Sequence, residues 1–468
     1  MNLAKLIGFA IGPFAAAALG LLSVPLMAWI FTPEVIGQIT MFNTFLAGTA
    51  LVLTLGLDQA YVREYHEVEN KTQLLRSVLS LSFVVVVVAV IAIIIFNQSL
   101  VKLLFSLSNN TLLIASGIAL AVIVSILYRF LSLVLRMQER GFHYSLLQVS
   151  AKVTLVISLV LLFIFKGEGD FYIAFAFSCT ALVVAAIVAV LLTRKECYLA
   201  LTSSFNKKIT QKAIKFGTPL VVSGFAYWGL ISIDRWAIRY YSGLEQLGIY
   251  SVAYSFAAVM AIFQQVFSTI WAPIVYRWHQ QGTNIKQFLM VTDWVVIILS
   301  SVFFMVVLAS PLIVLFLPKT YQGVVYLLPA CMLFPVFYTL SETTVVGINI
   351  ARKTNYAIVI TVLPLFLNLL LCVLLIPVFS AGGAAVAVAA AFGLYLILRT
   401  EISKKVWQQF NSGKLYFVAL LLFVNALWPA LTVSSLPWYL TLTSLVIVLS
   451  LYSERIYNLK TIIRAIKS

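Results

Sequence analysis

The chain contains 468 residues, of which 62% are hydrophobic and only 10% are charged, and its formal net charge is +16. Soluble proteins carry about 25% charged residues, so this composition excludes an ordinary soluble protein and predicts that lipid surrounds most of the surface. A nucleic-acid-binding protein is excluded as well, because DNA and RNA binders present Lys and Arg on a polar face that long apolar runs cannot provide.

The first apolar stretch follows Lys5 and superficially resembles a secretory signal. It is about 25 residues long, which is too long for the apolar core of a signal, and it contains Pro13 and Pro25. Further apolar runs follow it. We therefore predict that this stretch is the first retained membrane span.

Apolar runs long enough to cross a bilayer recur along the whole chain. A spanning helix needs about 20 apolar residues, and this length predicts about fourteen spans in an all-α, polytopic membrane protein. The first six cover 6–30, 37–57, 77–97, 111–130, 143–165 and 171–192. The next six cover 214–240, 246–275, 287–317, 323–350, 355–378 and 382–400, and two more lie at 415–433 and 437–453.

The positions of Lys and Arg in the connections predict the orientation of these spans. With both termini in the cytoplasm, all but five of the 31 Lys and Arg residues fall on the cytoplasmic side. The net positive charge therefore reports insertion topology and attraction to anionic lipid. The five exceptions are Lys102, Lys166, Arg235, Arg239 and Lys319.

Weak internal repeats divide the chain into two lobes. Three pairs of landmarks, Gly37 with Gly248, Arg140 with Lys353 and Gly169 with Gly382, lie about 212 residues apart. We predict a six-helix lobe at 1–195, a cytoplasmic linker at 196–213, a second six-helix lobe at 214–405, and helices 13 and 14 with a cytoplasmic tail at 406–468. An even number of spans per lobe relates the lobes by a pseudo-two-fold axis along the membrane normal, as in alternating-access transporters with a substrate site between the lobes.

Two stretches carry a family resemblance. The first is Trp29–Gly37 followed by Leu55–Arg63, and the second is Ile233–Ile238 followed by Leu247–Tyr254 and the pair Ala272 and Pro273. In order and at these spans, the motifs resemble the Wzx-type oligosaccharide flippases of the multidrug/oligosaccharidyl-lipid/polysaccharide exporter superfamily. That family has two six-helix lobes, often with two extra C-terminal helices.

The resemblance implies a function in surface polysaccharide biosynthesis, such as that of lipopolysaccharide O-antigen. The chain would move an undecaprenyl-pyrophosphate-linked oligosaccharide from the inner to the outer leaflet of the bacterial cytoplasmic membrane. A polysaccharide polymerase and a chain-length regulator would be its protein partners, and it would need no cofactor beyond a coupling proton or sodium ion.

Basic residues within or beside the spans are candidates for contact with the pyrophosphate. The spacing of Arg129, Arg136 and Arg140, at i, i+7 and i+11, predicts one stripe of guanidinium groups on one continuous helix at the cytoplasmic end of span 4. Lys152 lies about ten residues into span 5, where an isolated ammonium is costly. Arginine also binds phosphate oxygens bidentately. Snorkelling to headgroups or pairing with acids would equally explain these residues. The predicted substrate-binding residues are Arg129, Arg136, Lys152, Arg235 and Arg239, the last two being interfacial anchors in the alternative interpretation.

Four acids are candidates for gating or ion coupling. Asp58, Asp293 and Glu342 lie near the inner ends of spans 2, 9 and 10, and Asp234 lies next to Arg235. Asp58, Asp293 and Glu342 could neutralise Lys152 or Arg129, or bind a coupling proton or cation, and the sequence leaves both roles open.

Other functional classes fit less well. A membrane glycan polymerase or ligase would need a sizeable outer loop, and an acyltransferase would need an intramembrane His as base, whereas His66, His143 and His279 fall in cytoplasmic connections. We find no nucleotide-binding Gly-rich loop, and we predict neither catalytic nor metal-binding residues. A cation-coupled drug or metabolite antiporter of the same superfamily remains the alternative, although it would favour a cavity dominated by acids.

Overall fold

The computed structural model describes residues 3–167, 169–282, 285–351, 353, 355–455 and 457, with side chains from residue 11 onward. These residues form helices and no strand, which confirms the predicted all-α membrane protein. The chain divides into two compact units, Met1–Ser232 (unit 1) and Ile233–Ser468 (unit 2), which we describe separately.

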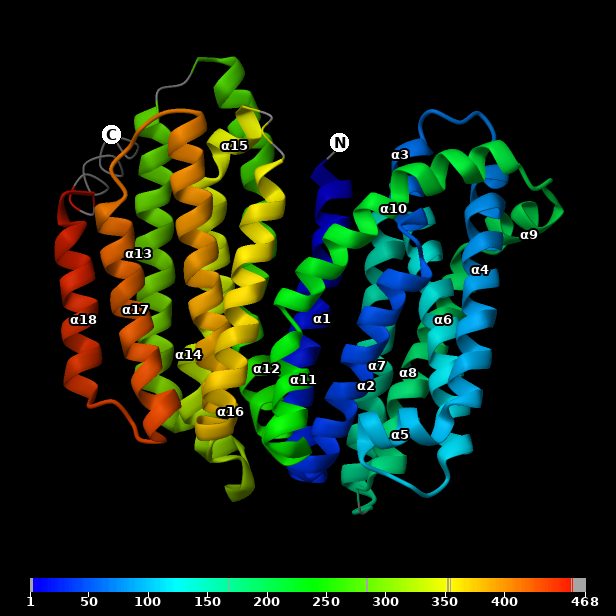
Figure 1. Cartoon of the computed structure of the whole chain (residues 1–468), viewed down its shortest axis with the longest axis horizontal. Coiled ribbons are helices and arrows are strands. Elements are labelled where there is room, and N and C mark those ends of the chain that lie inside the picture. The colour runs from blue at the N-terminus through cyan, green and yellow to red at the C-terminus, as the bar shows by residue number, and fades with distance from the viewer. Residues whose placement is uncertain are drawn as a thin grey trace. The chain divides into compact units, whose positions relative to one another are not determined.

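Unit 1 contains ten helices within the described residues (Figure 1), and six of them are long and apolar enough to cross a membrane. Proline begins α2 and Asn or Asp side chains cap the first turns of α4, α8 and α10, as expected at helix starts. The helices are α1 (Leu3–Ile30), α2 (Pro33–Leu53), α3 (Leu57–Glu64), α4 (Lys71–Ile95), α5 (Asn97–Phe105), α6 (Thr111–Met137), α7 (Gly141–Ile164), α8 (Phe171–Leu192), α9 (Arg194–Thr202) and α10 (Lys207–Leu230).

Unit 2 is built around α14, whose apolar window is 89% buried. Such a helix is apolar on all sides because neighbouring helices, not lipid, cover it. The helices of unit 2 are α11 (Ile233–Tyr241), α12 (Gly243–Gln280), α13 (Ile285–Ala309), the 3₁₀ helices η1 (Ser310–Phe316) and η2 (Lys319–Tyr321), α14 (Val324–Thr344), α15 (Val346–Ile350), α16 (Tyr356–Val406), α17 (Gly413–Thr432) and α18 (Trp438–Leu451).

Eleven of the described helices are long and apolar enough to cross a membrane, or twelve if α10 and α11 count as one broken span. The 51 residues of α16 would extend about 76 Å as one helix, which is more than twice the roughly 30 Å of a bilayer core. Its backbone breaks at Ser380, with φ 50° and ψ −130°, so its two arms correspond to the predicted spans 355–378 and 382–400 (Figure 1). The 14 residues of α18 form a shorter helix at the predicted last span.

Several predicted spans differ from the helices in detail. The predicted span 37–57 ends earlier, at Leu53, because Leu55 and Gly56 adopt positive φ. A separate helix, α3, begins at Leu57. The predicted span 214–240 is interrupted between Leu230 and Ile233. The two compact units meet in the chain at this interruption, whereas the predicted linker 196–213 holds α9 and the first residues of α10. The lobe boundaries drawn from the repeats stay a prediction.

Two glycines allow α3 and α10 to cross closely in unit 1. A Cβ added to Gly217 would lie 2.7 Å from the carbonyl oxygen of Leu55 and 2.8 Å from the carbonyl carbon of Gly56, and Gly56 itself has φ +69°. Lys212 and Glu64 form an ion pair beside this crossing, with Nζ 2.5 Å from Oε2. The start of α10 is therefore packed tightly on unit 1.

We expect Gly217→Ala to destabilise the protein by about 1 to 3 kcal/mol, because the backbone facing it must move. Gly224→Ala is the matched control on the same helix, since its Cβ would meet only Leu51 Cδ2 at an ordinary contact of 3.5 Å. Thermal unfolding in detergent measures both changes. Equal midpoints for the two variants would show that the close crossing does not limit stability.

Candidate functional site

Asp58 and Arg129 form a partly buried ion pair in unit 1. Asp58 lies in the first turn of α3 and Arg129 on α6, and Nε and Nη2 of Arg129 donate to Asp58 Oδ2 at 2.9 and 2.6 Å. The side chain of Asp58 is 4% exposed and that of Arg129 is 36% exposed. Of the two partners expected for this acid, the structure selects Arg129 and not Lys152.

The predicted arginine stripe does not extend to Arg140, and this part of the prediction is wrong. Helix α6 ends at Met137, and Glu139 adopts a positive φ of 55°. Arg140 therefore precedes α7 and lies 3.8 Å from Glu196 Oε1. Arg136 remains on α6 with an exposed side chain, so Arg129 and Arg136 alone share the helix.

Lys152 lies near the middle of α7, roughly 16 Å from either end at 1.5 Å per residue. Its side chain is exposed on the protein surface. Among the described side chains, no acid forms an ion pair with it. Ser145, two turns earlier, accepts a hydrogen bond from the backbone N–H of Gly12 at 2.9 Å. Because residues seven apart share a stripe, Lys152 lies on the side of α7 that packs on α1.

Asp234 and Arg235 are embedded in unit 2 at the start of α11. Asp234 is fully buried and accepts a hydrogen bond from Tyr250 Oη at 2.5 Å, while its Oδ1 accepts none within the described part of the chain. The guanidinium carbon of Arg235 lies 4.8 Å from the centre of the Tyr254 ring, a distance at which a cation–π interaction is favourable. Arg239 is half-buried one turn later.

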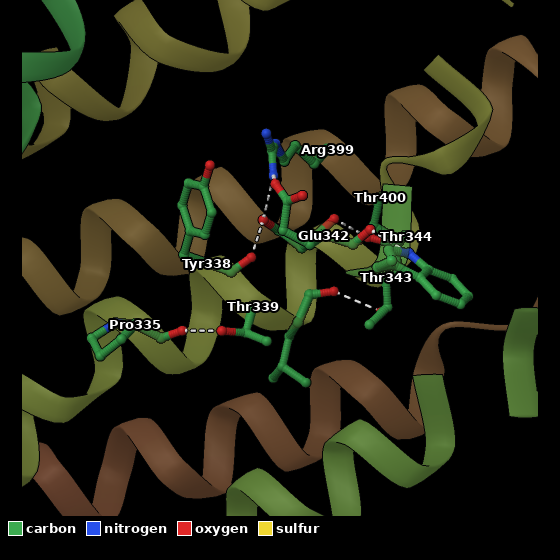
Figure 2. Close-up of polar contacts among 11 residues, drawn as sticks. Pro335, Tyr338, Thr339, Glu342, Thr343, Thr344, Arg399 and Thr400 are labelled. Carbon is green, nitrogen blue, oxygen red and sulfur yellow. Dashed lines mark hydrogen bonds and ion pairs between the residues drawn. The ribbon is translucent and has the colours of Figure 1, made fainter. Parts of the chain in front are cut away.

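Glu342 pairs with Arg399 inside unit 2 (Figure 2). Arg399 Nη1 lies 2.5 Å from Glu342 Oε1, and the two side chains are only 14% and 17% exposed. The rings of Tyr338 and Tyr395 flank the guanidinium at 5.1 and 4.6 Å. Arg399 also donates to Ser341 Oγ at 3.0 Å. The arginine is thus paired, hydrogen-bonded and covered by aromatic rings.

Arg399 is a residue that the sequence pattern did not single out. It lies at the end of a predicted span, and counting Lys and Arg in the connections assigned it to the cytoplasmic side. One feature of the sequence could have identified it. Arg399 is the single charged residue of the predicted span 382–400, and it lies four residues after Tyr395, on the same helix face.

Asp293 pairs with Arg455, which follows α18. Arg455 Nε donates to Asp293 Oδ2 at 2.9 Å, and both side chains are partly exposed. This pair connects the first half of α13 to the C-terminal end of α18. Each of the four predicted coupling acids therefore has an ion-pair or hydrogen-bond partner within its own unit. Lys152, in contrast, lies deep in a span and forms no ion pair with a described acid.

The described residues contain no group of three or more His, Cys, Asp and Glu side chains that could hold a metal ion. Unit 1 instead presents the ammonium of Lys152 near the middle of a span, while Asp58 and Glu342 are each neutralised by an ion pair with an arginine. Such a surface suits an anionic group that must pass through a low-dielectric region.

Comparison with known proteins supports a transporter fold. The sequence profile of the family described as polysaccharide biosynthesis protein matches residues 3–279. No curated protein sequence matches the chain. Three solved structures are similar over most of the chain, at identities that show the fold alone.

The first is "Lipid II flippase MurJ, inward closed conformation", with a TM-score of 0.69, 16% identity, and coverage of 96% of this chain and 100% of that chain. The second is an inward-facing multidrug resistance MATE family transporter of the MOP superfamily, with a TM-score of 0.61, 14% identity and coverage of 83% and 94%. The third is a point mutant of the Vibrio cholerae MATE transporter VcmN, with a TM-score of 0.56, 15% identity and coverage of 86% and 96%.

Proposed function

The chain belongs to the polysaccharide biosynthesis protein family, and from this premise we propose that it is a flippase for an undecaprenyl-pyrophosphate-linked oligosaccharide. It would carry this substrate from the inner to the outer leaflet of the bacterial cytoplasmic membrane by alternating access of its two units. Both termini would lie in the cytoplasm. We propose no covalent step, so the protein acts as a transporter and not as an enzyme.

The observation that carries this proposal is the position of Lys152. An ammonium at mid-bilayer depth costs about 2.5 to 3.5 kcal/mol on insertion scales, and no described acid offsets this cost. A pyrophosphate that binds there would offset it and would itself be neutralised in part. We therefore assign the headgroup contact in unit 1 to Lys152, with Arg129 and Arg136 receiving the substrate nearer the end of α6.

The paired acids favour a flippase over a drug antiporter. An antiporter of cationic compounds needs an acid that is available to its cargo, and Asp58, Asp293 and Glu342 are occupied by arginines. We propose that Asp234 binds the coupling proton or sodium ion, because its Oδ1 is a buried oxygen that accepts no hydrogen bond within the described residues. Arg235 and Arg239 would then set the local potential on α11.

Deletion of the gene tests the function. We expect lipid-linked repeat units to accumulate on the cytoplasmic leaflet and surface polysaccharide to disappear, because the polymerase and chain-length regulator act on the outer side. Leaflet assays with a membrane-impermeant lectin or oxidant measure the first effect, and surface glycan staining measures the second. Normal surface glycan in a strain without a redundant flippase, together with altered drug resistance, would establish the antiporter alternative instead.

A further inference from the structure

The short helix α9 and the residues after it expose an unusual surface of unit 1. We define the linker face as Arg194, Lys195, Tyr198, Leu201, Lys207 and Lys208, all of which have exposed side chains. Helix α8, a membrane-spanning candidate, ends at Leu192, and α9 begins at Arg194. Thr193 between them is buried and donates to the Ala189 carbonyl at 2.7 Å. The linker face therefore begins where a span leaves the bilayer.

Large apolar side chains project outward from this segment. Tyr198 is 68% exposed and Leu201 is 70% exposed, and the following Phe205 is 53% exposed, whereas Ala200 is buried against the unit. Helix α9 thus packs the small side chains of Cys197 and Ala200 against the unit and leaves its large apolar side chains exposed. Tyrosine is enriched where a membrane meets water, and interfacial helices combine such side chains with Lys and Arg.

The charge on the linker face is entirely positive. Arg194, Lys195, Lys207 and Lys208 form no ion pair among the described side chains. Glu196, the acid of α9, turns toward the unit, where it accepts a hydrogen bond from Gln138 Nε2 at 2.9 Å. Each Lys or Arg near an anionic membrane surface contributes about 1 kcal/mol to binding.

Hydrogen bonds to the start of α4 hold this segment in place. Thr72 Oγ1 and Ser203 Oγ are 2.9 Å apart, Gln73 Nε2 donates to Ser204 Oγ at 2.9 Å, and the backbone N–H of Asn206 donates to Ser77 Oγ at 3.1 Å. Figure 1 shows α9 at the end of unit 1 where α4 begins. The linker face is therefore ordered before any ligand binds, which lowers the entropic cost of binding.

We propose that the linker face binds the headgroups of anionic phospholipids, with Tyr198 and Leu201 inserted at the level of the headgroups. Positive charge without acids selects an anionic surface, and the outward Tyr and Leu side chains select one with an apolar layer beneath it. The side of the membrane is the one that the Lys and Arg distribution predicts to be cytoplasmic. This contact would hold α9 and the start of α10 at the membrane surface, and it does not depend on the chain being a flippase.

The test uses the full-length protein in nanodiscs of neutral phosphatidylcholine, with and without phosphatidylglycerol. We expect phosphatidylglycerol to raise the thermal midpoint of the wild type, and salt to weaken this effect. The test variant changes four cations of the linker face to Gln, namely Arg194, Lys195, Lys207 and Lys208. It should lose most of the rise in thermal midpoint caused by phosphatidylglycerol, and its midpoint in neutral lipid should equal that of the wild type. The matched control changes four exposed cations outside the linker face to Gln, namely Lys215, Arg277, Lys353 and Lys405, and should keep most of the shift.

A depth measurement separates a lipid surface from an acidic protein partner. A fluorophore attached at Leu201→Cys in a variant without the native cysteines should be quenched by headgroup and shallow acyl-chain nitroxide lipids. The same fluorophore at Gln211→Cys, an exposed polar position on α10, should be quenched less. Equal quenching at the two positions, or equal loss of the lipid shift in the two four-residue variants, would overturn the proposal. The proposal would also be overturned, in favour of a protein partner, if anionic peptides raised the thermal midpoint and anionic lipid vesicles did not.

Discussion

Replacing Lys152 with alanine is expected to reduce transport at least about tenfold, because a hydrogen bond to a charged group contributes about 1.5 to 3 kcal/mol. The same change should leave the protein folded. Removing an unpaired ammonium from the middle of α7 also removes a cost of insertion, so the thermal midpoint should stay the same or rise. Complementation of surface polysaccharide and flipping of a fluorescent lipid-linked saccharide in proteoliposomes measure the first effect, and unfolding in detergent measures the second.

Two further variants make this prediction specific. Lys152→Arg keeps the positive charge and should retain much of the activity, whereas Lys166→Ala, in the connection after α7, should behave as the wild type. A gain in stability with lost transport identifies a functional cation. Full transport by Lys152→Ala would remove this residue from the mechanism, and a large loss of stability would make it a packing residue.

Replacing Glu342 with alanine is expected to destabilise the protein by about 3 to 5 kcal/mol, because it leaves the buried charge of Arg399 without its partner. The effect comes from desolvation and not from the attraction alone. The double variant Glu342→Ala with Arg399→Leu should recover most of the lost stability, since it removes both charges. Thermal or denaturant unfolding of the three proteins in the same detergent measures the coupling.

Asp293 and Arg455 provide the comparison for this pair. Their side chains are 24% and 43% exposed, so Asp293→Ala should cost no more than about 1 kcal/mol, as exposed ion pairs do. If Glu342→Ala and Asp293→Ala destabilise equally, burial does not govern the energetics of these pairs. If the double variant at Glu342 and Arg399 is no better than the single variant, the ion pair is not the cause of the loss.

Apolar length predicted where most helices lie, and local backbone conformation decided where they break. The prediction treats 37–57 as one span because this run contains no charged residue, but Leu55 and Gly56 adopt positive φ and α2 ends before them. The prediction of two spans at 355–378 and 382–400 agrees with α16, whose two arms are separated by the non-helical backbone of Ser380. A single residue's φ and ψ depend on what packs against it, and hydropathy does not contain this information.

Charge pairing shows the same division between local pattern and three-dimensional contact. Asp58 and Arg129 are 71 residues apart in the chain. From the sequence, Lys152 was an equally good partner for Asp58. Arg399 joins Glu342 across 57 residues, and the count of basic residues assigned it to a connection. The stripe from Arg129 to Arg140 was wrong because helical spacing predicts a shared face only while the helix continues, and α6 ends at Met137.

The sequence by itself determined that this is a helical membrane protein with many spans, because the cost of burying polar groups in lipid forces long apolar runs that can be recognised without a structure. It also identified Lys152 as a charge deep in a span. Only the tertiary structure decided which charges are already neutralised, because an ion pair depends on positions within 4 Å between helices that are distant in the chain. These contacts separate the acids and arginines that form ion pairs from the cations that form none with a described acid, which are Lys152 and the exposed Lys and Arg residues of the linker face.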